Sequence, residues 1–586
     1  MRYLALATDY DNTLAEDGRV ADATWAALER LRESGRYPIL VTGRELDDLM
    51  TVCPRVDMFS RVVAENGGVL FDPATKDKQL LADAPPQAFV DALRERGLEH
   101  FSVSETLVAT MKPNEQIAFE AIRDLGLELN VVFNGDAVMI LQPGVSKASG
   151  LMAALAALRL SPLNVVGVGD AENDHALIRA CGMSVAVENA LPALKQHADL
   201  VTSQPDGRGV AALIDALIAD DLRGHASSLA KCRLIVGKRR EAPESAAAPV
   251  VSIDAYGSVV LLAGASGSGK STTTEALLER LADAGHQLCI VDPEGDYSSD
   301  DHTAVVGDAQ HAPAEDEALQ LLEGARQPAV AINMMRVPPG ERPQYCAALL
   351  PRLQALRART GRPHWLVFDE AHHLFPRAWA SASTAVPEAL DSALVVTVHP
   401  EQLSPALLKH VNVAIALGDD AADKLDEFAA SVGIDPPIAP TKGVERGEAL
   451  FWEPAQGEPC VVTIERGRGQ HRRHLRKYAE GLLIPERSFY FRGTRGQLNL
   501  RAHNLILFVE LAEGVDEETW RFHLQRGDYS QWFESVIGDV ELANETRTIE
   551  RDESLPPGES RSRVLSAITA RYTQPENPNL PRVDER

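Results

Sequence analysis

The sequence predicts an α/β protein made of two successive α/β units and a small, mainly helical C-terminal module. Short apolar runs alternate with helical patterns over residues 1–225, and the alternation resumes over residues 251–465. Strand–helix–strand alternation is typical of a parallel sheet with helices on both faces. Residues 466–586 break this rhythm, because a basic run is followed there by helical patterns with aromatic anchors. We therefore expect two doubly wound units followed by a helical module.

Three further stretches depart from the alternation. Residues 84–140 hold several short segments inside the first unit, and we predict that they form an inserted cap. Residues 226–250 replace apolar runs with Pro, Ala and charged residues, which is typical of a linker. The basic run "RGRGQHRRHLRKY", residues 466–478, is interpreted as a solvated connector or as a segment that contacts neighbouring subunits of a ring. Tyr478 is its only interleaved aromatic residue, so base stacking on a single strand is not supported. Phosphate binding by this run stays open as an alternative.

The aromatic residues of the C-terminal module indicate a packed core. They fall at helical spacing, a pattern that favours a core over a ligand-binding surface. We interpret the module as a docking or oligomerisation unit. The residues concerned are Trp520, Phe522, Tyr529, Trp532 and Phe533.

The composition of the chain disfavours several classes of binding partner and metal site. The 586 residues carry a formal net charge of −27, so the surface repels nucleic acid and acidic membranes unless basic side chains gather locally. The six cysteines form no CxxC pair, and neither a zinc site nor a disulfide framework is expected. No apolar run approaches the roughly 18 residues that span a bilayer. The N-terminal segment reads as a buried strand, and we expect a cytoplasmic protein without a membrane partner.

The first unit carries polar side chains where its apolar runs end. The run "YLALATDY" leads into Asp9 and Asp11, two carboxylates that could hold Mg²⁺ and divide nucleophilic and acid–base roles. The run "YPILVTGR" contains Thr42, whose hydroxyl is placed to bond a phosphate oxygen. Ligands bind at the carboxyl ends of strands in open α/β sheets, so these side chains are predicted to meet at one edge.

Two later segments add to the same edge. Lys147, in "GVSKASGL", offers an ammonium against the charge that develops on a transferring phosphoryl group. The run "NVVGVGDAENDHAL" ends in Asp170, Asn173 and Asp174, which would complete an oxygen-rich Mg²⁺ site. Each feature alone is weak, but all of them occur in order along the chain.

This set resembles the haloacid dehalogenase (HAD) superfamily of phosphohydrolases. It is similar above all to the Cof-type or sugar-phosphatase-like branch, in which a cap lies between the second and third motifs. The segments "AENGGVL" (64–70) and "VAVENALPALKQHADLVT" (185–202) also resemble that branch, and the likeness extends over about residues 1–220. Asn12 departs from the family pattern, which usually has Gly there. The resemblance implies a Rossmann-like sheet with an inserted α/β cap.

The same resemblance implies roles for individual residues. Asp9 would be the nucleophile that forms an aspartyl-phosphate, and Asp11 the general acid and base. Thr42 and Lys147 would hold the phosphoryl group. The substrate class would be a small phosphomonoester, sugar phosphates included. The implied Mg²⁺ ligands and their supporting residues are Asp9, Asp11, Asp170 and Asp174.

The second unit contains a phosphate-binding loop. "GASGSGKST" follows an apolar run and precedes an amphipathic helical pattern, with the spacing GxxxxGKS. Backbone N–H groups of such a loop close around phosphates, the lysine reaches the β- and γ-phosphate oxygens, and the serine binds Mg²⁺. The predicted ATP-binding residues are Gly264, Gly267, Ser268, Gly269, Lys270, Ser271 and Thr272.

Acidic residues that would complete this ATP site follow another apolar run. "HWLVFDEAHHLF" supplies Asp369, predicted to hold Mg²⁺, and Glu370, predicted to polarise the attacking water. "ALVVTVHPEQL" ends in Thr397 and His399, which could sense the γ-phosphate, although a histidine with no role in the site is the more common case. This arrangement favours ATP hydrolysis.

The second unit resembles HerA/FtsK-type P-loop ATPases over about residues 250–465. "DPEGDY", "DEAHHLF" and the strand before "HPEQL" carry the likeness. It implies a RecA-like domain and a homo-oligomer, with a hexameric ring that moves DNA among the options. A HerA-type N-terminal barrel is not recognisable, since the phosphatase-like unit stands there instead. Candidates for an arginine finger, by position only, are Arg336, Arg342 and Arg352.

Three functions therefore stay open. The first is a metabolite phosphatase regulated by an ATPase domain. The second is a nucleic-acid motor for repair or phage defence with an accessory phosphatase, which the basic run supports and the net charge of −27 opposes. The third is a bifunctional kinase–phosphatase, which Glu370 opposes because a kinase needs no water-activating carboxylate. The predicted partners are a small phosphorylated metabolite, ATP and Mg²⁺, with nucleic acid open.

Overall fold

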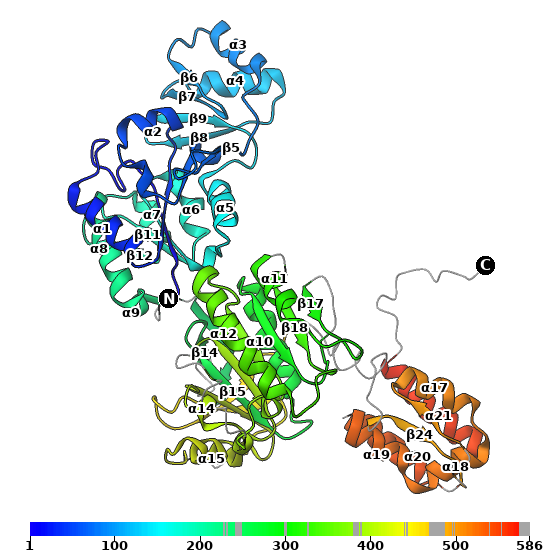
Figure 1. Ribbon diagram of the computed structural model, residues 1–586. Coiled ribbons are helices and arrows are strands. Elements are labelled where there is room, and N and C mark those ends of the chain that lie inside the picture. The colour runs from blue at the N-terminus through cyan, green and yellow to red at the C-terminus, as the bar shows by residue number, and fades with distance from the viewer. Residues whose placement is uncertain are drawn as a thin grey trace.

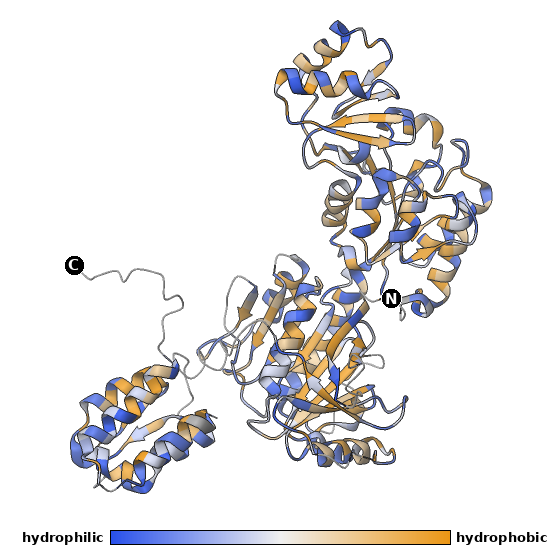
Figure 2. Cartoon of the chain, turned by 180° about the vertical axis from the view of Figure 1, so that it is seen from behind, coloured by the Kyte–Doolittle hydropathy of each residue, from blue (hydrophilic) through white to orange (hydrophobic). Residues whose placement is uncertain are grey.

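The structure of the chain is a computed structural model (Figure 1). It describes residues 1–226, 229, 232–240, 249–297, 302–324, 327–378, 386, 390–438, 440, 443–467, 487–494, 496, 498–537, 539–552 and 554–572. Two large sheets, a small cap sheet and a helical C-terminal region confirm the predicted α/β class. Strands of the sheets are predominantly apolar, whereas polar residues line the outer sides of the helices (Figure 2). Among these residues, no helix is long and apolar enough to cross a membrane.

The first sheet has eight strands in the order β12-β11-β10-β1-β2-β3-β4-β5. Six are parallel, and β4 and β5 extend the sheet as an antiparallel hairpin. The strands are β1 (Ala5–Thr8), β2 (Tyr37–Val41), β3 (Arg61–Ala64), β4 (Val69–Phe71), β5 (Lys78–Leu80), β10 (Val165–Gly169), β11 (Met183–Ala186) and β12 (Leu200–Val201).

Helices cover both faces of this sheet, as the sequence predicts. On one face α1 packs against α8, and on the other α5 contacts β2, β3 and α6. Buried leucines such as Leu28 of α1 and Leu151 of α5 fill the two layers. The helices are α1 (Asp22–Glu33), α2 (Leu46–Val52), α5 (Lys147–Leu158), α6 (His175–Arg179), α7 (Pro192–His197), α8 (Asp206–Asp220) and α9 (Arg223–Ala226).

A separate antiparallel sheet lies between β5 and α5, where the sequence predicts a cap. Its strand order is β6-β7-β9-β8, and two helices pack on it through a core that includes Phe89, Val108 and Ile140. These elements stand at the top of Figure 1, above the first large sheet. They are α3 (Gln87–Glu95), β6 (Phe101–Val103), β7 (Leu107–Met111), α4 (Glu115–Leu125), β8 (Asn130–Asn134) and β9 (Ala137–Leu141).

The second large sheet has eleven strands in the order β14-β13-β23-β22-β21-β15-β20-β19-β16-β18-β17. The strands from β21 to β17 in this order run parallel to one another, and the other four are antiparallel. The parallel strands are β15 (Val259–Gly264), β16 (Leu288–Asp292), β17 (Thr303–Val306), β18 (Ala329–Asn333), β19 (Trp365–Phe368), β20 (Ala393–Thr397) and β21 (Val413–Leu417).

Part of the predicted linker belongs to this sheet instead. Residues 233–239 form β13, which pairs with β14 and β23, because Leu234 and Val236 alternate with exposed residues and are buried in the core beneath. The remaining antiparallel strands and the helices are β14 (Val250–Asp254), β22 (Glu448–Trp452), β23 (Cys460–Ile464), α10 (Lys270–Asp283), α11 (Glu315–Gly324), α12 (Arg342–Thr360), α14 (Pro405–Leu408) and α15 (Ala421–Val432).

The C-terminal region packs around an aromatic core. Trp520, Tyr529 and Phe533 are fully buried, Trp532 is nearly so, and Phe522 is half-exposed, which confirms the core interpretation for four of the five rings. The predicted basic connector, apart from residues 466–467, lies outside the described residues. The elements are β24 (Phe489–Phe491), β25 (Leu500–Ala502), α17 (Leu505–Gly514), α18 (Glu517–Arg526), α19 (Asp528–Trp532), a π-helical turn (Phe533–Ile537), α20 (Val540–Glu550) and α21 (Pro557–Tyr572).

The two large sheets meet at the edges where their strands begin. Asn164, directly before β10, donates from Nδ2 to Arg2 O (2.6 Å), and its Oδ1 lies 3.2 Å from His364 Nε2. His364 stands directly before β19 and accepts at Nδ1 from Gln287 N (2.7 Å), so its ring hydrogen is on Nε2, which donates to Asn164 Oδ1. The Arg2 guanidinium lies 3.7 Å from the Tyr256 ring centroid. The carboxyl ends of the two sets of strands therefore face away from this contact.

The contact can be tested with a pair of matched glycines. Gly361 ends α12 at a φ of 74°, and a Cβ there would lie 2.1 Å from Asn164 Oδ1. Gly433 ends α15 at a φ of 75° with nothing within 4 Å of the same position. Both Gly→Ala changes add left-handed strain of about 1–2 kcal/mol. We expect Gly361→Ala to lower the melting temperature further, because Asn164 is held at both ends of its amide. Equal melting temperatures in differential scanning calorimetry would contradict this.

Candidate active sites

The first site lies where β1 ends. All four residues of β1 are buried and pair in parallel with β2 and β10, so the strand carries Asp9 to the carboxyl edge of the sheet. Asp9 is 2% exposed, and Lys147 Nζ lies 2.6 Å from its Oδ1 and 2.7 Å from Asp174 Oδ1. A capping box between Ser146 and Ser149 begins α5 at Lys147, which orients this fully buried ammonium toward Asp9.

Asp9 is one of three buried carboxylates that lie close together at the carboxyl edge of this sheet. Single oxygens of Asp9, Asp170 and Asp174 lie within 4.8 Å of one another, and all three residues are buried. Asp174 Oδ2 accepts from the backbone N–H groups of Asp170 (3.0 Å) and Ala171 (3.1 Å), which fixes the turn after β10. Thr13 Oγ1 donates to Asp170 Oδ1 (2.7 Å). Carboxylate oxygens at this separation suit Mg²⁺, which prefers hard oxygen ligands.

The charges of this cluster also suit a bound Mg²⁺. Burial, against the pull of Lys147, raises the pKa of Asp9 well above its usual range. Burial and the neighbouring Asp174 raise the pKa of Asp170 to about 6. Burial alone would lower the pKa of Lys147, but Asp174 and Asp9 outweigh it and raise that pKa. One ammonium among three buried carboxylates leaves negative charge in excess, which a divalent cation would neutralise.

Asp11 and Thr42 lie beside this cluster, and an arginine joins them. Arg44 donates from Nε (2.7 Å) and Nη2 (2.8 Å) to the two carboxylate oxygens of Asp11. Hydrogen bonding to Asp11 raises the pKa of Arg44. The buried Thr42 hydroxyl accepts from Arg44 N (3.1 Å). Sequence reasoning missed Arg44, although "TGR" places it two residues after Thr42.

The second site lies at the carboxyl end of β15. Lys270, at the start of α10, donates from Nζ to Gly264 O (2.9 Å) and Ala265 O (3.0 Å), so its ammonium lies inside the curve of the glycine-rich loop. Burial lowers the pKa of Lys270, and Glu370 and Asp369 oppose that shift. Ser271 and Thr272 follow on the exposed side of the first helical turn. The loop, including Gly267, Ser268 and Gly269, connects β15 directly to α10.

Strand order brings the acidic partners to this loop. One strand, β20, lies between β15 and the strand β19 that precedes Asp369. Burial raises the pKa of Asp369 well above its usual range, and Asp296 and Asp292 add to the shift. A bound Mg²⁺ would compensate this buried negative charge, so the donor set fits the metal predicted for the site.

A histidine joins two of the predicted groups. His372 Nδ1 lies 3.5 Å from Glu370 Oε2 and 3.2 Å from Thr397 Oγ1. Burial, with His373 next, lowers the pKa of His372 to about 4, so the ring is neutral at neutral pH. His399 instead pairs through Nδ1 with Glu401 Oε1 (3.2 Å) and is 44% exposed. Sequence reasoning missed His372, although it stands two residues after Glu370.

The unit that contains the Asp9 site is similar to known hydrolases. The family model for haloacid dehalogenase-like hydrolases matches residues 6–120 and 97–214. A phosphoglycolate phosphatase of Methanothermobacter thermautotrophicus is 33% identical over 215 residues, which span 35% of this chain and 95% of the relative. The chain belongs to the haloacid dehalogenase-like hydrolases. A phosphoglycolate phosphatase of Archaeoglobus fulgidus is 32% identical over 215 residues, with 35% of this chain and 93% of that protein covered.

This hydrolase also contains an ATPase domain. The family model for an AAA domain matches residues 253–399, from the end of β14 to just after β20. The chain is thus a HAD-type phosphatase joined to an AAA ATPase domain, and the finer HerA/FtsK assignment stays a prediction. A solved haloacid dehalogenase-like hydrolase from Bacteroides thetaiotaomicron is 19% identical, covers 37% of this chain and 99% of its own, and has a TM-score of 0.34.

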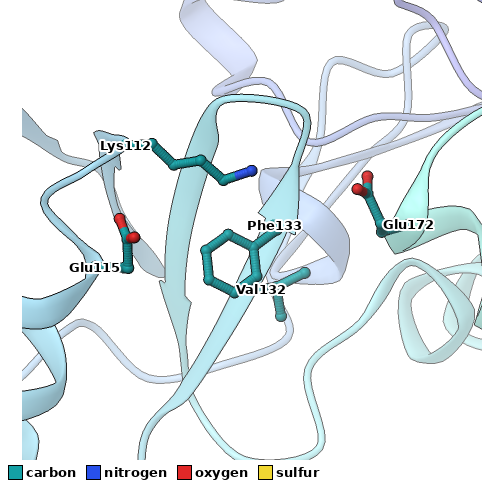
Figure 3. Close-up of a pocket in the computed structure, with 5 residues that line it drawn as sticks. All are labelled: Lys112, Glu115, Val132, Phe133 and Glu172. Carbon is teal, nitrogen blue, oxygen red and sulfur yellow. The ribbon is translucent and has the colours of Figure 1, made fainter.

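The cap of the hydrolase forms a pocket beside the Asp9 cluster. Its volume is about 400 Å³, and its lining includes Glu172, which lies between Asp170 and Asp174 in the turn after β10. Figure 3 shows the Lys112 side chain extending across the pocket, with the Phe133 ring beside it and Glu172 on the opposite wall from Glu115. The Lys112 ammonium lies 5.3 Å from the Phe133 centroid. Sequence reasoning did not find this pocket, because β8, α4 and the turn after β10 meet only in the fold.

Proposed function

We propose that the HAD domain hydrolyses a small phosphomonoester through a phosphorylated Asp9, with Mg²⁺ bound by Asp9, Asp170 and Asp174. The single observation that carries the proposal is Lys147, whose buried ammonium bonds both Asp9 (2.6 Å) and Asp174 (2.7 Å). Such an ammonium holds the nucleophile in place and neutralises charge on the transferring group. When bound, Mg²⁺ would bring the substrate phosphate close to the anionic Asp9 by neutralising both.

The residues support a two-step reaction. Asp9 attacks phosphorus, the bond from phosphorus to the leaving oxygen breaks, and protonated Asp11 gives its proton to that oxygen. Asp11 then takes a proton from water, the water oxygen attacks phosphorus, and the bond to Asp9 breaks to release phosphate. Arg44 donates to both oxygens of Asp11 in this structure, so Asp11 has to leave Arg44 before it can carry a proton to the leaving oxygen.

The substrate is a small polar molecule that fits under the cap. The curated relatives are phosphoglycolate phosphatases, which supports a short phosphorylated acid. The lining of the pocket supports hydroxylated substrates such as sugar phosphates, since Glu115 and Glu172 accept from hydroxyls and Phe133 offers an apolar face. Phosphate release from phosphoglycolate, glycerol phosphate and hexose phosphates, with Mg²⁺ and with chelator, tests the proposal. Absence of Mg²⁺-dependent release from the whole panel would contradict it.

Lys112 is expected to contribute to substrate affinity rather than to chemistry. Its ammonium lines the pocket and has no bond to Asp9, Asp11 or Lys147 among the contacts of the described residues. Loss of one charge-assisted hydrogen bond corresponds to about 1.5–3 kcal/mol, or roughly a 10- to 100-fold rise in KM. We expect Lys112→Ala to show that rise with kcat nearly unchanged. Lys76→Ala, at an exposed turn, is the control, and an unchanged KM for Lys112→Ala would contradict the assignment.

For the AAA domain we propose ATP hydrolysis with Asp369 as the Mg²⁺ ligand and Glu370 as the group that activates water. Thr397 lies at the end of β20, between the phosphate-binding loop and Asp369, a position suited to sensing the γ-phosphate. The presence of Glu370 supports hydrolysis over kinase transfer. A DNA motor and a ring-shaped oligomer stay as alternatives. ATP hydrolysis with and without duplex DNA, over a salt series, tests them, because DNA stimulation that fades with salt supports a motor.

A further inference from the structure

A buried turn after β3 contacts the cap and three catalytic loops at once. The turn comprises Glu65, Asn66 and Gly67, and all three residues are buried. Glu65 and Asn66 adopt left-handed φ angles of 52° and 53°. Left-handed backbone is unfavourable by about 1–2 kcal/mol for a residue such as glutamate. Strained residues of this kind persist only where the surroundings hold them, and they gather at functional sites.

Glu65 binds the cap. Its Oε2 accepts three hydrogen bonds, from Thr106 N (2.8 Å), Thr106 Oγ1 (2.7 Å) and Ser104 Oγ (2.8 Å). Thr106 and Ser104 lie in the turn between β6 and β7, so the carboxylate ties the first hairpin of the cap to the core. Hydrogen bonds to an ionised carboxylate are the stronger kind, and together they offset the backbone strain at Glu65.

Asn66 binds the loop that carries two of the metal-site carboxylates. Asn173 Nδ2 donates to Asn66 Oδ1 (3.1 Å), and Asn173 directly precedes Asp174. Asn173 Oδ1 is buried and accepts no hydrogen bond within the part of the chain that the structure describes. The amide of Asn66 is therefore the side-chain contact that orients Asn173 there.

The backbone of the turn contacts two further catalytic segments, the loop after β2 and the start of α5. Glu65 N donates to Arg44 O (2.8 Å) and Asn66 N donates to Thr42 O (3.0 Å), which holds the loop that clamps Asp11. Gly67 lies against the start of α5, where a Cβ on it would stand 2.0 Å from Ser146 O. That contact lies directly before Lys147.

We propose that Glu65 and Asn66 are positioning residues that couple the cap to the catalytic loops of the phosphatase. Glu65 sets where the cap sits over the site, and Asn66 sets the orientation of the Asp170–Asp174 turn. Neither side chain contacts Asp9, so both act through other residues. The inference rests on the proposed phosphatase function for its kinetic consequence, whereas the coupling itself is a property of the fold.

Two substitutions at Asn66 separate positioning from folding. Asn66→Gly removes the amide and relieves the left-handed strain, whereas Asn66→Asp keeps an oxygen that accepts from Asn173. Substitution of residues that orient a metal site typically costs about 10- to 100-fold in activity or metal affinity. We expect that loss in kcat for Asn66→Gly, with KM changed less, and recovery of most of the rate in Asn66→Asp. ATP hydrolysis by the same purified chains should be unchanged, which reports an intact ATPase domain, and an unchanged melting transition of the HAD domain reports that this domain is folded.

Glu65 is tested through its partner. Glu65→Gln and Thr106→Val each remove part of the contact, and we expect each to change KM and kcat together, as displacement of a cap does. The double variant should be no worse than the more damaging single one, because both act on one contact. Glu105→Gln is the matched control: this neighbouring carboxylate pairs with Lys78 on the surface and is 44% exposed.

Amide hydrogen exchange tests the coupling between the cap and the catalytic loops without a measurement of activity. Peptides covering residues 101–111 should exchange faster in Glu65→Gln, and peptides covering residues 166–180 should exchange faster in Asn66→Gly. If the wild type releases no phosphate from the substrate panel, the proposed function is contradicted, but the hydrogen-exchange experiment still tests the coupling. Wild-type exchange in both peptides of both variants would overturn the inference, and so would a wild-type kcat in Asn66→Gly.

Discussion

Replacing Asp9 with asparagine is expected to abolish phosphate release from the HAD domain. The amide is a poor nucleophile, and its NH₂ group would face the Lys147 ammonium, which now lies 2.6 Å from a carboxylate oxygen. Loss of a catalytic nucleophile lowers kcat by about a thousandfold or more. The measurement is phosphate release under saturating Mg²⁺, with the best substrate of the panel.

Two controls make the Asp9 result specific. Asp17→Asn changes an exposed acid eight residues on, at a left-handed position that asparagine tolerates, and should keep the wild-type rate. ATP hydrolysis by Asp9→Asn should also be unchanged, because Asp9 lies at the carboxyl edge of the first sheet, on the side away from the ATPase domain. Full phosphatase activity in Asp9→Asn would show that the nucleophile is another group.

The positions of the candidate catalytic side chains at strand ends could be predicted because a local pattern places them. Asp9, Asp170 and Asp369 each follow a buried run in a parallel sheet, and such runs bring their last residues to one edge whatever the connections between them. Spacing alone likewise placed Lys270 at the start of a helix. Roles were harder to assign than positions, since Thr397 contacts His372 whereas His399 pairs with Glu401.

What the sequence did not predict depends on contacts between distant segments. The clamp of Arg44 on Asp11 joins residues 33 apart, and the bond of Asn66 with Asn173 joins residues 107 apart. Strand β13 looked like a linker because its flanks are rich in Pro, Ala and charge, while its apolar run, Leu234 to Val236, is too short to stand out. These contacts and this strand can be recognised only when the pairing of the strands in the fold is known.

The back-to-back arrangement of the two sheets restricts how the two activities can be linked. Asn164 and His364 join the ends at which β10 and β19 begin, whereas Asp9 and Asp369 lie at the opposite ends of their sheets. A product therefore cannot pass directly from one active site to the other. Any influence of ATP on the phosphatase has to travel through the strands and helices that meet at this contact, or through another copy of the chain.

Replacing Lys270 with alanine is expected to abolish ATP hydrolysis. Its ammonium lies among the carbonyls of the phosphate-binding loop, and we expect it to reach the phosphates when ATP binds. A loss of at least about a hundredfold is expected, as for removal of one electrostatic contact to a transition state. Lys409→Ala, an exposed lysine of the same domain, is the control. The phosphatase rate of Lys270→Ala, with and without ATP, then separates two arrangements. Equal rates in the wild type with and without ATP mean independent sites, whereas loss in Lys270→Ala of an ATP effect seen in the wild type means that nucleotide bound at this site acts on the phosphatase.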